Sequence, residues 1–123
     1  MMTKTEHPAS AKKRIIVEMG MGTDLYGEDA TKAARRAVQD AIHHSSLLLF
    51  RHLGMDAQKM EIELRIAAPD PDAVDLATVA AELPYGQVKP TATRAGLRVV
   101  DGDRVTTIVN VALIVRVDVP SVL

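Results

Sequence analysis

The sequence predicts an α+β fold, a two-layer sandwich in which a four-stranded sheet carries two helices on one face. Three features predict it: segments that alternate apolar and polar residues, segments with helical spacing, and their order along the chain, β-α-β-α-β-β. A chain of 123 residues has room for one hydrophobic core. We therefore expect residues 1–13 to form a polar, disordered tail and residues 14–123 to form a single α+β domain.

The first half of the chain predicts a strand, a glycine-rich loop and a long helix. β-branched residues favour a strand from Arg14 to Met19, and a glycine-rich loop follows at residues 20–29. Asp29 is a good N-cap for a helix whose alanine-rich stripe continues until Gly54 stops it. Because alanine side chains are short, we expect this helix to lie close against the sheet.

The second half predicts a strand, a short helix and two further strands, at residues 59–68, 75–83, 87–100 and 105–119. Asp101-Gly102-Asp103 separates the last two strands and favours a tight hairpin turn. The last strand is apolar on both faces, and its second apolar set is Ile108, Ala112 and Ile114. A face exposed to water would not need this second set, so we expect a homo-oligomer built sheet to sheet.

Composition excludes several classes of partner. Lys and Arg number 15 against 16 Asp and Glu, so the chain lacks the basic surface that nucleic acid or an anionic membrane would require. With 0 Cys there is no thiolate metal site and no cysteine nucleophile. The apolar runs are too short for a transmembrane segment or a signal peptide, so we expect a cytoplasmic protein. The sequence identifies no cofactor and predicts no metal site.

The glycine-rich loop is the first candidate ligand site. It fails as a dinucleotide fingerprint because Leu25 stands where a glycine is needed, and it fails as a phosphate loop because Glu28 follows Gly27. It presents Asp24, which is suited to accept hydrogen bonds, to act as a general base or to bind a hard cation. A structural turn with helix caps explains the loop equally well.

Three polar residues outside the loop are further candidates. His44 and Ser45 lie on or beside the apolar stripe of the long helix, and Asn110 interrupts the last strand. Buried polar groups need partners, so each residue has two interpretations: satisfaction by the protein's own backbone, or contact with a ligand.

At the loop the sequence resembles the Lin family, short hypothetical proteins with a G-x-G-x-D-x-H-G motif near the N-terminus. The matching residues are Gly20, Gly22, Asp24 and Gly27, with Tyr26 in the place of the histidine. Similarity continues through Asp40-Ala41-Ile42, His44-Ser45, the segment Leu83 to Val88, and Ile108-Val109-Asn110. The family has no established activity, so the resemblance implies a site without a reaction, and Tyr26 implies that any role of the histidine is altered.

Two functions remain open. One is a hydrolase of a small polar amide or cyclic amide, with a site at a subunit interface, Asp24 as base and His44 as its proton partner. Its ligand would be held by Gly20, Gly22, Tyr26, Gly27, Ser45 and Asn110. The element order is similar to the repeating unit of ring-opening amidohydrolases, a likeness of fold only. The other function is an oligomeric metabolite-binding or accessory protein without turnover.

Overall fold

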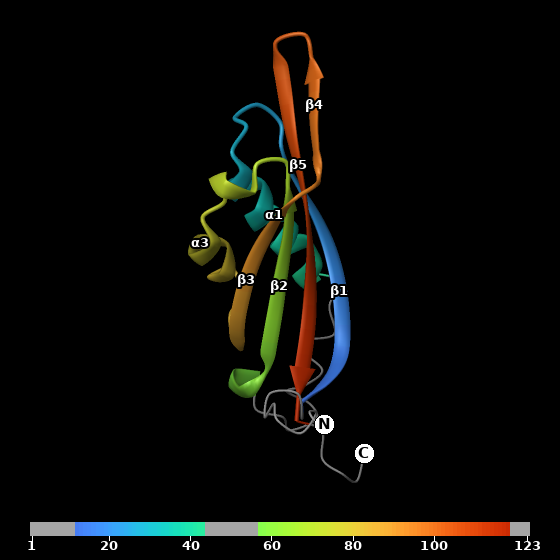
Figure 1. Ribbon diagram of the computed structural model, residues 1–123, viewed down its shortest axis with the longest axis vertical. Helices are drawn as coiled ribbons and strands as arrows, with labels where there is room; N and C mark the ends of the chain where they lie inside the picture. Colours follow the sequence, from blue (N-terminus) through green and yellow to red (C-terminus); the bar gives the residue numbers. More distant parts are fainter. Residues whose placement is uncertain (1–11, 44–56, 119–123) are drawn as a thin grey trace, which may run out of the picture.

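The computed structural model describes residues 12–43 and 57–118. It is an α+β structure in which a five-stranded sheet carries two helices on one face (Figure 1). The strands are β1 (Lys13–Asp24), β2 (Glu61–Ala68), β3 (Gln87–Arg94), β4 (Leu97–Asp101) and β5 (Arg104–Val117). The helices are α1 (Ala30–His43) and α3 (Leu76–Ala80), and short 3₁₀ turns lie at Ala57–Lys59 and Pro71–Ala73.

The long strand β5 organises the sheet. It pairs antiparallel with β1 along one side and with β2 and β4 along the other, while β3 pairs parallel with β2. On that second side β2 pairs with residues 110–116 of β5 and β4 with residues 104–108. The β4–β5 hairpin therefore extends beyond the end of β2, as the upper part of Figure 1 shows.

The predicted strand at residues 87–100 is wrong, because the chain breaks it at Gly96. This residue has φ +76°, and a Cβ atom there would lie 2.4 Å from the carbonyl oxygen of Ile108. Only glycine adopts this conformation at such close approach without strain. The break makes two strands, β3 and β4, with different partners, so the sheet has five strands where four were predicted. The hairpin turn at Gly102, with φ +67°, confirms the predicted turn.

Other predicted boundaries shift by a few residues. The first strand begins at Lys13, inside the predicted tail, and continues past Met19 to Asp24. The predicted short helix at residues 75–83 is helical only from Leu76 to Ala80. The long helix begins as predicted, with the Lys32 N–H donating to Asp29 Oδ1 at 3.0 Å. Its predicted part beyond residue 43 lies outside the described residues.

The core lies between the helices and the inner face of the sheet. Alanines of α1 and the alternate residues Ile62, Leu64 and Ile66 of β2 are fully buried there. β5 contributes Val109, Val111, Leu113 and Val115 from the same face. The predicted alternation of β2 and the alanine stripe of α1 are thus confirmed.

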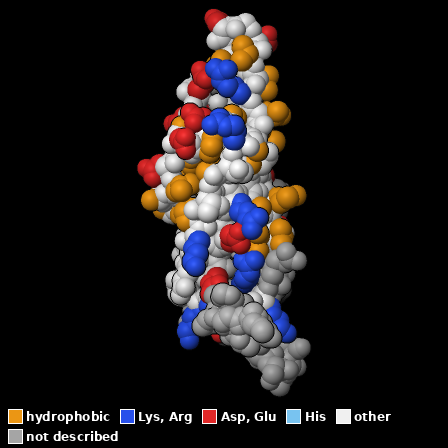
Figure 2. Space-filling model, in the orientation of Figure 1, with side chains coloured by type: hydrophobic (Ala, Val, Ile, Leu, Met, Phe, Trp, Pro, Cys, Tyr) orange, Lys and Arg blue, Asp and Glu red, His pale blue; other side chains and the backbone are white. Residues whose placement is uncertain are grey.

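The opposite side of the sheet, here called the open face, has no helix over it within the described residues. Val17, Met19 and Met21 of β1 lie on it beside Ile114, Ala112 and Asn110 of β5. The three β1 side chains are 51%, 73% and 55% exposed. Figure 2 shows hydrophobic side chains along the β1 border of this face and charged side chains over its middle.

Candidate functional site

The first two glycines of the predicted loop belong to strand β1. Gly20 pairs with Val111 and Gly22 with Val109, so the loop begins only at Leu25. A Cβ atom at Gly20 would lie 2.2 Å from the carbonyl oxygen of Ala37, and one at Gly22 would lie 2.1 Å from that of Ala33. Both glycines are needed because α1 packs directly on the strand backbone.

The amides of these glycines face the sheet. The N–H of Met21 points away from β5, because it donates to Asp40 Oδ2 of α1 at 2.9 Å. Successive residues of a strand direct their backbone groups to alternate sides, so the N–H groups of Gly20 and Gly22 point toward β5. In this arrangement the two amides belong to the β ladder and are not free to donate to a ligand.

Asp24 is a buried carboxylate at the end of β1. It is 4% exposed, and its Oδ2 accepts from the Asp29 N–H at 2.9 Å. Its Oδ1 lies 3.8 Å from Lys32 Nζ and 4.0 Å from Arg36 Nη1. The Asp29 hydrogen bond, assisted by these cations and by the Gly27 N–H, lowers the pKa of Asp24 against the opposing effect of burial. Asp24 stays ionised at neutral pH and has its acceptors engaged.

The short loop after Asp24 is fastened to the β4–β5 hairpin. Thr106 Oγ1 donates to the carbonyl oxygen of Leu25 at 3.4 Å, and the Arg104 guanidinium lies 5.2 Å from the centroid of the Tyr26 ring. Arg98 Nη2 pairs with Glu28 Oε1 at 2.9 Å. Tyr26 itself is 71% exposed. The phenol therefore stands at the surface, where it contacts the hairpin.

Gly27 stands against the Asp24 carboxylate. A Cβ atom at this position would lie 2.8 Å from Asp24 Oδ2, closer than real Cβ atoms approach an oxygen. The glycine, the buried carboxylate and the N-terminus of α1 form one packed unit. The motif residues Asp24 and Gly27 thus have a structural explanation, and a ligand role for them stays a prediction.

Asn110 lies on the open face, away from Asp24. Its neighbour across the strands is Met21, whose side chain is exposed, whereas Asp24 contacts α1 on the other side of the sheet. The hydrolase interpretation expected the two residues to converge with His44, and they do not lie together. His44 and Ser45 lie outside the described residues.

A depression surrounds Asn110. It has a volume of about 530 Å³ and is lined by Met19, Gly20, Met21, Asp40, Asn110 and Val111. It brings together two predicted ligand residues, Gly20 and Asn110. Met19, Met21 and Asp40 were not predicted as site residues from the sequence. The alternation of Met19 and Met21 with Gly20 and Gly22 was the signal that an apolar strand face lay opposite the helix.

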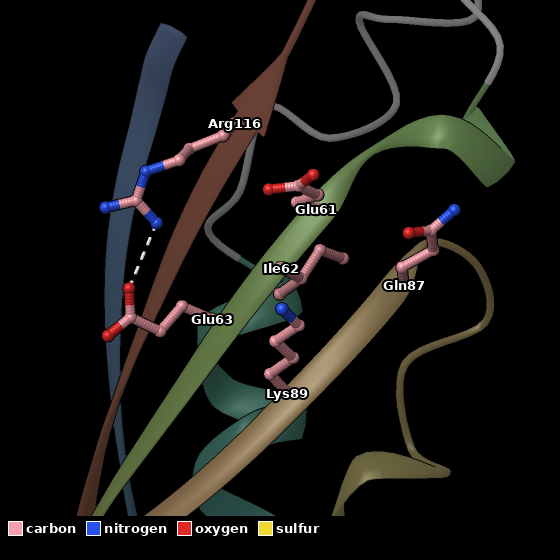
Figure 3. A pocket seen from close by; sticks show the side chains of 6 residues that line it. All are labelled: Glu61, Ile62, Glu63, Gln87, Lys89 and Arg116. Atoms are coloured by element: carbon pink, nitrogen blue, oxygen red, sulfur yellow. Dashed lines mark hydrogen bonds and ion pairs between the residues drawn. The ribbon is translucent and has the colours of Figure 1, made fainter. Parts of the chain in front are cut away.

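A second, more polar pocket lies at the other end of the open face (Figure 3). It has a volume of about 180 Å³ and is lined by Glu61, Ile62, Glu63, Gln87, Lys89 and Arg116. Glu63 pairs with Arg116 at 3.0 Å and also with Arg65, and hydrogen bonds from these arginines lower its pKa. The Lys89 ammonium points from β3 toward β2, and it makes no ion pair with another described residue. We call this the cationic pocket, after Lys89, although its lining holds two acidic and two basic side chains.

The described part of the chain contains neither a cluster of metal ligands nor a membrane-spanning helix. No group of three or more His, Asp or Glu side chains is arranged to hold a metal ion among residues 12–43 and 57–118. Within the same ranges, neither helix has the length and hydrophobicity that crossing a bilayer requires.

Comparisons with known proteins identify a family and solved structures of similar fold. Residues 14–118 match the model of a family described as conserved hypothetical protein, Lin0512. The crystal structure of an FtsZ-like protein of unknown function from Nostoc punctiforme is similar, with a TM-score of 0.77 and 34% sequence identity. The match covers 86% of this chain and 96% of that one. No curated protein matches the sequence.

Proposed function

The chain belongs to the Lin0512 family of conserved hypothetical proteins, and we propose that it is an oligomeric small-molecule-binding protein without turnover of its own. Its ligand would occupy the depression around Asn110, and its subunits would associate through the open face. The observation that supports this proposal best is the combination, on one exposed surface, of the Asn110 amide with the side chains of Met19 and Met21.

The lining of the depression suits a small polar amide. Methionine side chains adapt their shape to irregular apolar groups, and the Asn110 amide offers both a donor and an acceptor. Asp40 adds a carboxylate at the rim, and the volume falls within the usual range of small-molecule sites, about 300–1,000 Å³. A ligand that exposes a carbonyl and an N–H group toward the Asn110 amide would pair with both its donor and its acceptor.

The hydrolase interpretation has less support from the described residues. A general base needs a free acceptor within hydrogen-bond reach of the proton it removes. Asp24 is occupied by the Asp29 N–H and by two cations, and its pKa is lowered, so it is a weak base. Turnover therefore stands as the alternative, and the experiment below separates it from binding.

The test is a thermal-shift measurement with asparagine, glutamine and 2-pyrrolidone as probes. We expect at least one probe to raise the melting temperature of the wild type and of the control Thr91→Ala, and to leave Asn110→Ala unchanged. Thr91 is an exposed residue of the open face outside the depression. Chromatography of the probe after prolonged incubation separates binding from hydrolysis. A consumed probe would establish the hydrolase, and equal shifts in all three proteins would refute the site.

A further inference from the structure

The open face and the β4–β5 hairpin together define how two copies meet. We infer that two chains pack open face to open face in an antiparallel, two-fold arrangement. In it, the acidic hairpin tip of each chain, Asp101 and Asp103, contacts the cationic pocket of the other. This inference rests on the self-association in the proposed function and adds its geometry.

The edges of the main sheet do not favour association by strand pairing. On the free edge of β1, Asp40 accepts from the Met21 N–H at 2.9 Å and Arg36 donates to the Thr23 carbonyl oxygen at 2.7 Å. β3 forms the other edge and contains Pro90, which has no N–H to offer a neighbouring strand. Capped edge groups and proline are the devices by which proteins prevent edge pairing. Association is left to the face.

The hairpin exposes more apolar surface than a free arm tolerates. All five residues of β4 are exposed, and Leu97, Val99 and Val100 are 59%, 46% and 58% accessible. Leu97 and Val99 pair with Ile108 and Thr106, so they extend the apolar strip of the open face. A two-stranded ribbon is marginally stable alone. A second protein surface over the hairpin would bury these side chains.

Charge identifies a second copy as the partner. Asp101 and Asp103 at the tip have no ion pair with any described residue, and Lys89 in the cationic pocket has none either. Arg116 lines the same pocket and has Glu63 as its one ion-pair partner in the described ranges. The chain thus presents two carboxylates without an ion-pair partner among the described residues at one end of the open face, and one such ammonium, that of Lys89, at the other.

These two ends cannot meet within one chain. Asp103 lies in the turn just before β5 and Arg116 near the end of that strand, about 40 Å away at about 3.3 Å per residue. A two-fold axis in the plane between the sheets, perpendicular to the strands, brings the tip of each chain to the pocket of the other. The same rotation keeps β1 over β1, so that the exposed methionines face one another. It also covers the depression around Asn110, which would become a site at the subunit boundary.

Cysteine cross-linking tests this geometry directly, because the chain has 0 Cys. We expect the double variant Lys89→Cys/Asp103→Cys to form disulfide-linked dimers on mild oxidation. The control Thr78→Cys/Asp103→Cys, with its first cysteine on α3, should remain uncross-linked. The single variant Asp103→Cys should also stay monomeric on a denaturing gel. A dimer formed by Asp103→Cys alone would mean that the tips meet each other, and would overturn the antiparallel arrangement.

Charge reversal gives an independent measurement in solution. By sedimentation equilibrium, Lys89→Asp should raise the dimer dissociation constant about tenfold, because the contact occurs twice. Adding Asp101→Lys and Asp103→Lys should restore it, and Arg35→Asp, the same charge change on the helical layer, should not affect it. A wild type that stays monomeric would refute self-association and this inference together. A wild-type dimer with neither cross-link nor rescue would refute the inference alone.

Discussion

Asp24→Asn is the sharpest test of how the family motif functions. The substitution keeps the shape of the side chain and removes its charge. The carboxylate accepts hydrogen bonds from the Asp29 N–H, at 2.9 Å to Oδ2, and from the Gly27 N–H. Its Oδ1 faces Lys32 and Arg36. An asparagine that turns its oxygen to the two amides must turn its NH₂ group to the two cations. We therefore expect the variant to fold with reduced stability.

The size of the loss follows from these contacts. Hydrogen bonds to a charged acceptor contribute about 1.5–3 kcal/mol each to stability, and the amide oxygen of asparagine retains part of this. The ion pairs add little, because the side chains of Lys32 and Arg36 are 51% and 52% exposed and solvent screens them. We expect the free energy of unfolding to fall by about 2 kcal/mol at pH 7.

The assay is urea unfolding of wild type, Asp24→Asn and the exposed control Asp72→Asn between pH 3 and pH 7. Because folding lowers the pKa of Asp24, its contribution is complete above its ordinary pKa and is lost as the pH falls through the lowered value. The gap between wild type and Asp24→Asn should therefore narrow as the pH falls toward 3, and the control should match wild type throughout. Equal urea midpoints at pH 7, with probe binding abolished, would refute the structural role and assign Asp24 to the ligand.

Three further substitutions test the packing, the open face and the helix cap. Gly22→Ala places a Cβ atom 2.1 Å from the Ala33 carbonyl oxygen, so α1 must move, and the free energy of unfolding should fall by about 3 kcal/mol. An unchanged midpoint of urea unfolding would contradict the close packing. Met19→Glu should shift sedimentation toward monomer with little change in melting temperature, because Met19 is 73% exposed, and an unaltered oligomer would argue against the open face. Asp29→Ala removes the acceptor of the Lys32 N–H and should lower the free energy of unfolding, measured by thermal melting, by about 1 kcal/mol. An unchanged free energy of unfolding would mean that solvent replaces the cap.

The sequence predicted the fold class because its strongest patterns are local. The alternation of residues 61–68 and the alanine stripe of α1 depend only on which face each residue presents, and both are observed. The division of residues 87–100 depends on a contact with Ile108, which is distant in sequence, and periodicity does not report it. A glycine inside an alternating run was the available signal, and its positive φ is what separates β3 from β4.

The site was harder to predict, because glycine serves opposite purposes. Gly20 and Gly22 were assigned to a flexible loop on composition, yet both lie in a strand where the absence of a side chain admits the helix. The carboxylate of Asp24 was recognised, but its partners Asp29 and Gly27 depend on the path of the chain between them. Asn110 was correctly predicted to lie on a strand. That its side chain lies on the open face became clear only from its pairing with Met21.

Strand β1 explains how one segment serves both faces of the sheet. Its even positions, Gly20 and Gly22, face α1, whereas Met19 and Met21 extend over the open face. A slip of one residue would drive methionine into the backbone of α1 and leave glycine on the open face. Because the two sets point apart, the two substitutions should act independently. The double variant should lose the unfolding free energy that Gly22→Ala loses and the association free energy that Met19→Glu loses. A double variant that departs from additivity by more than about 0.5 kcal/mol would mean that helix packing and self-association are coupled through the strand.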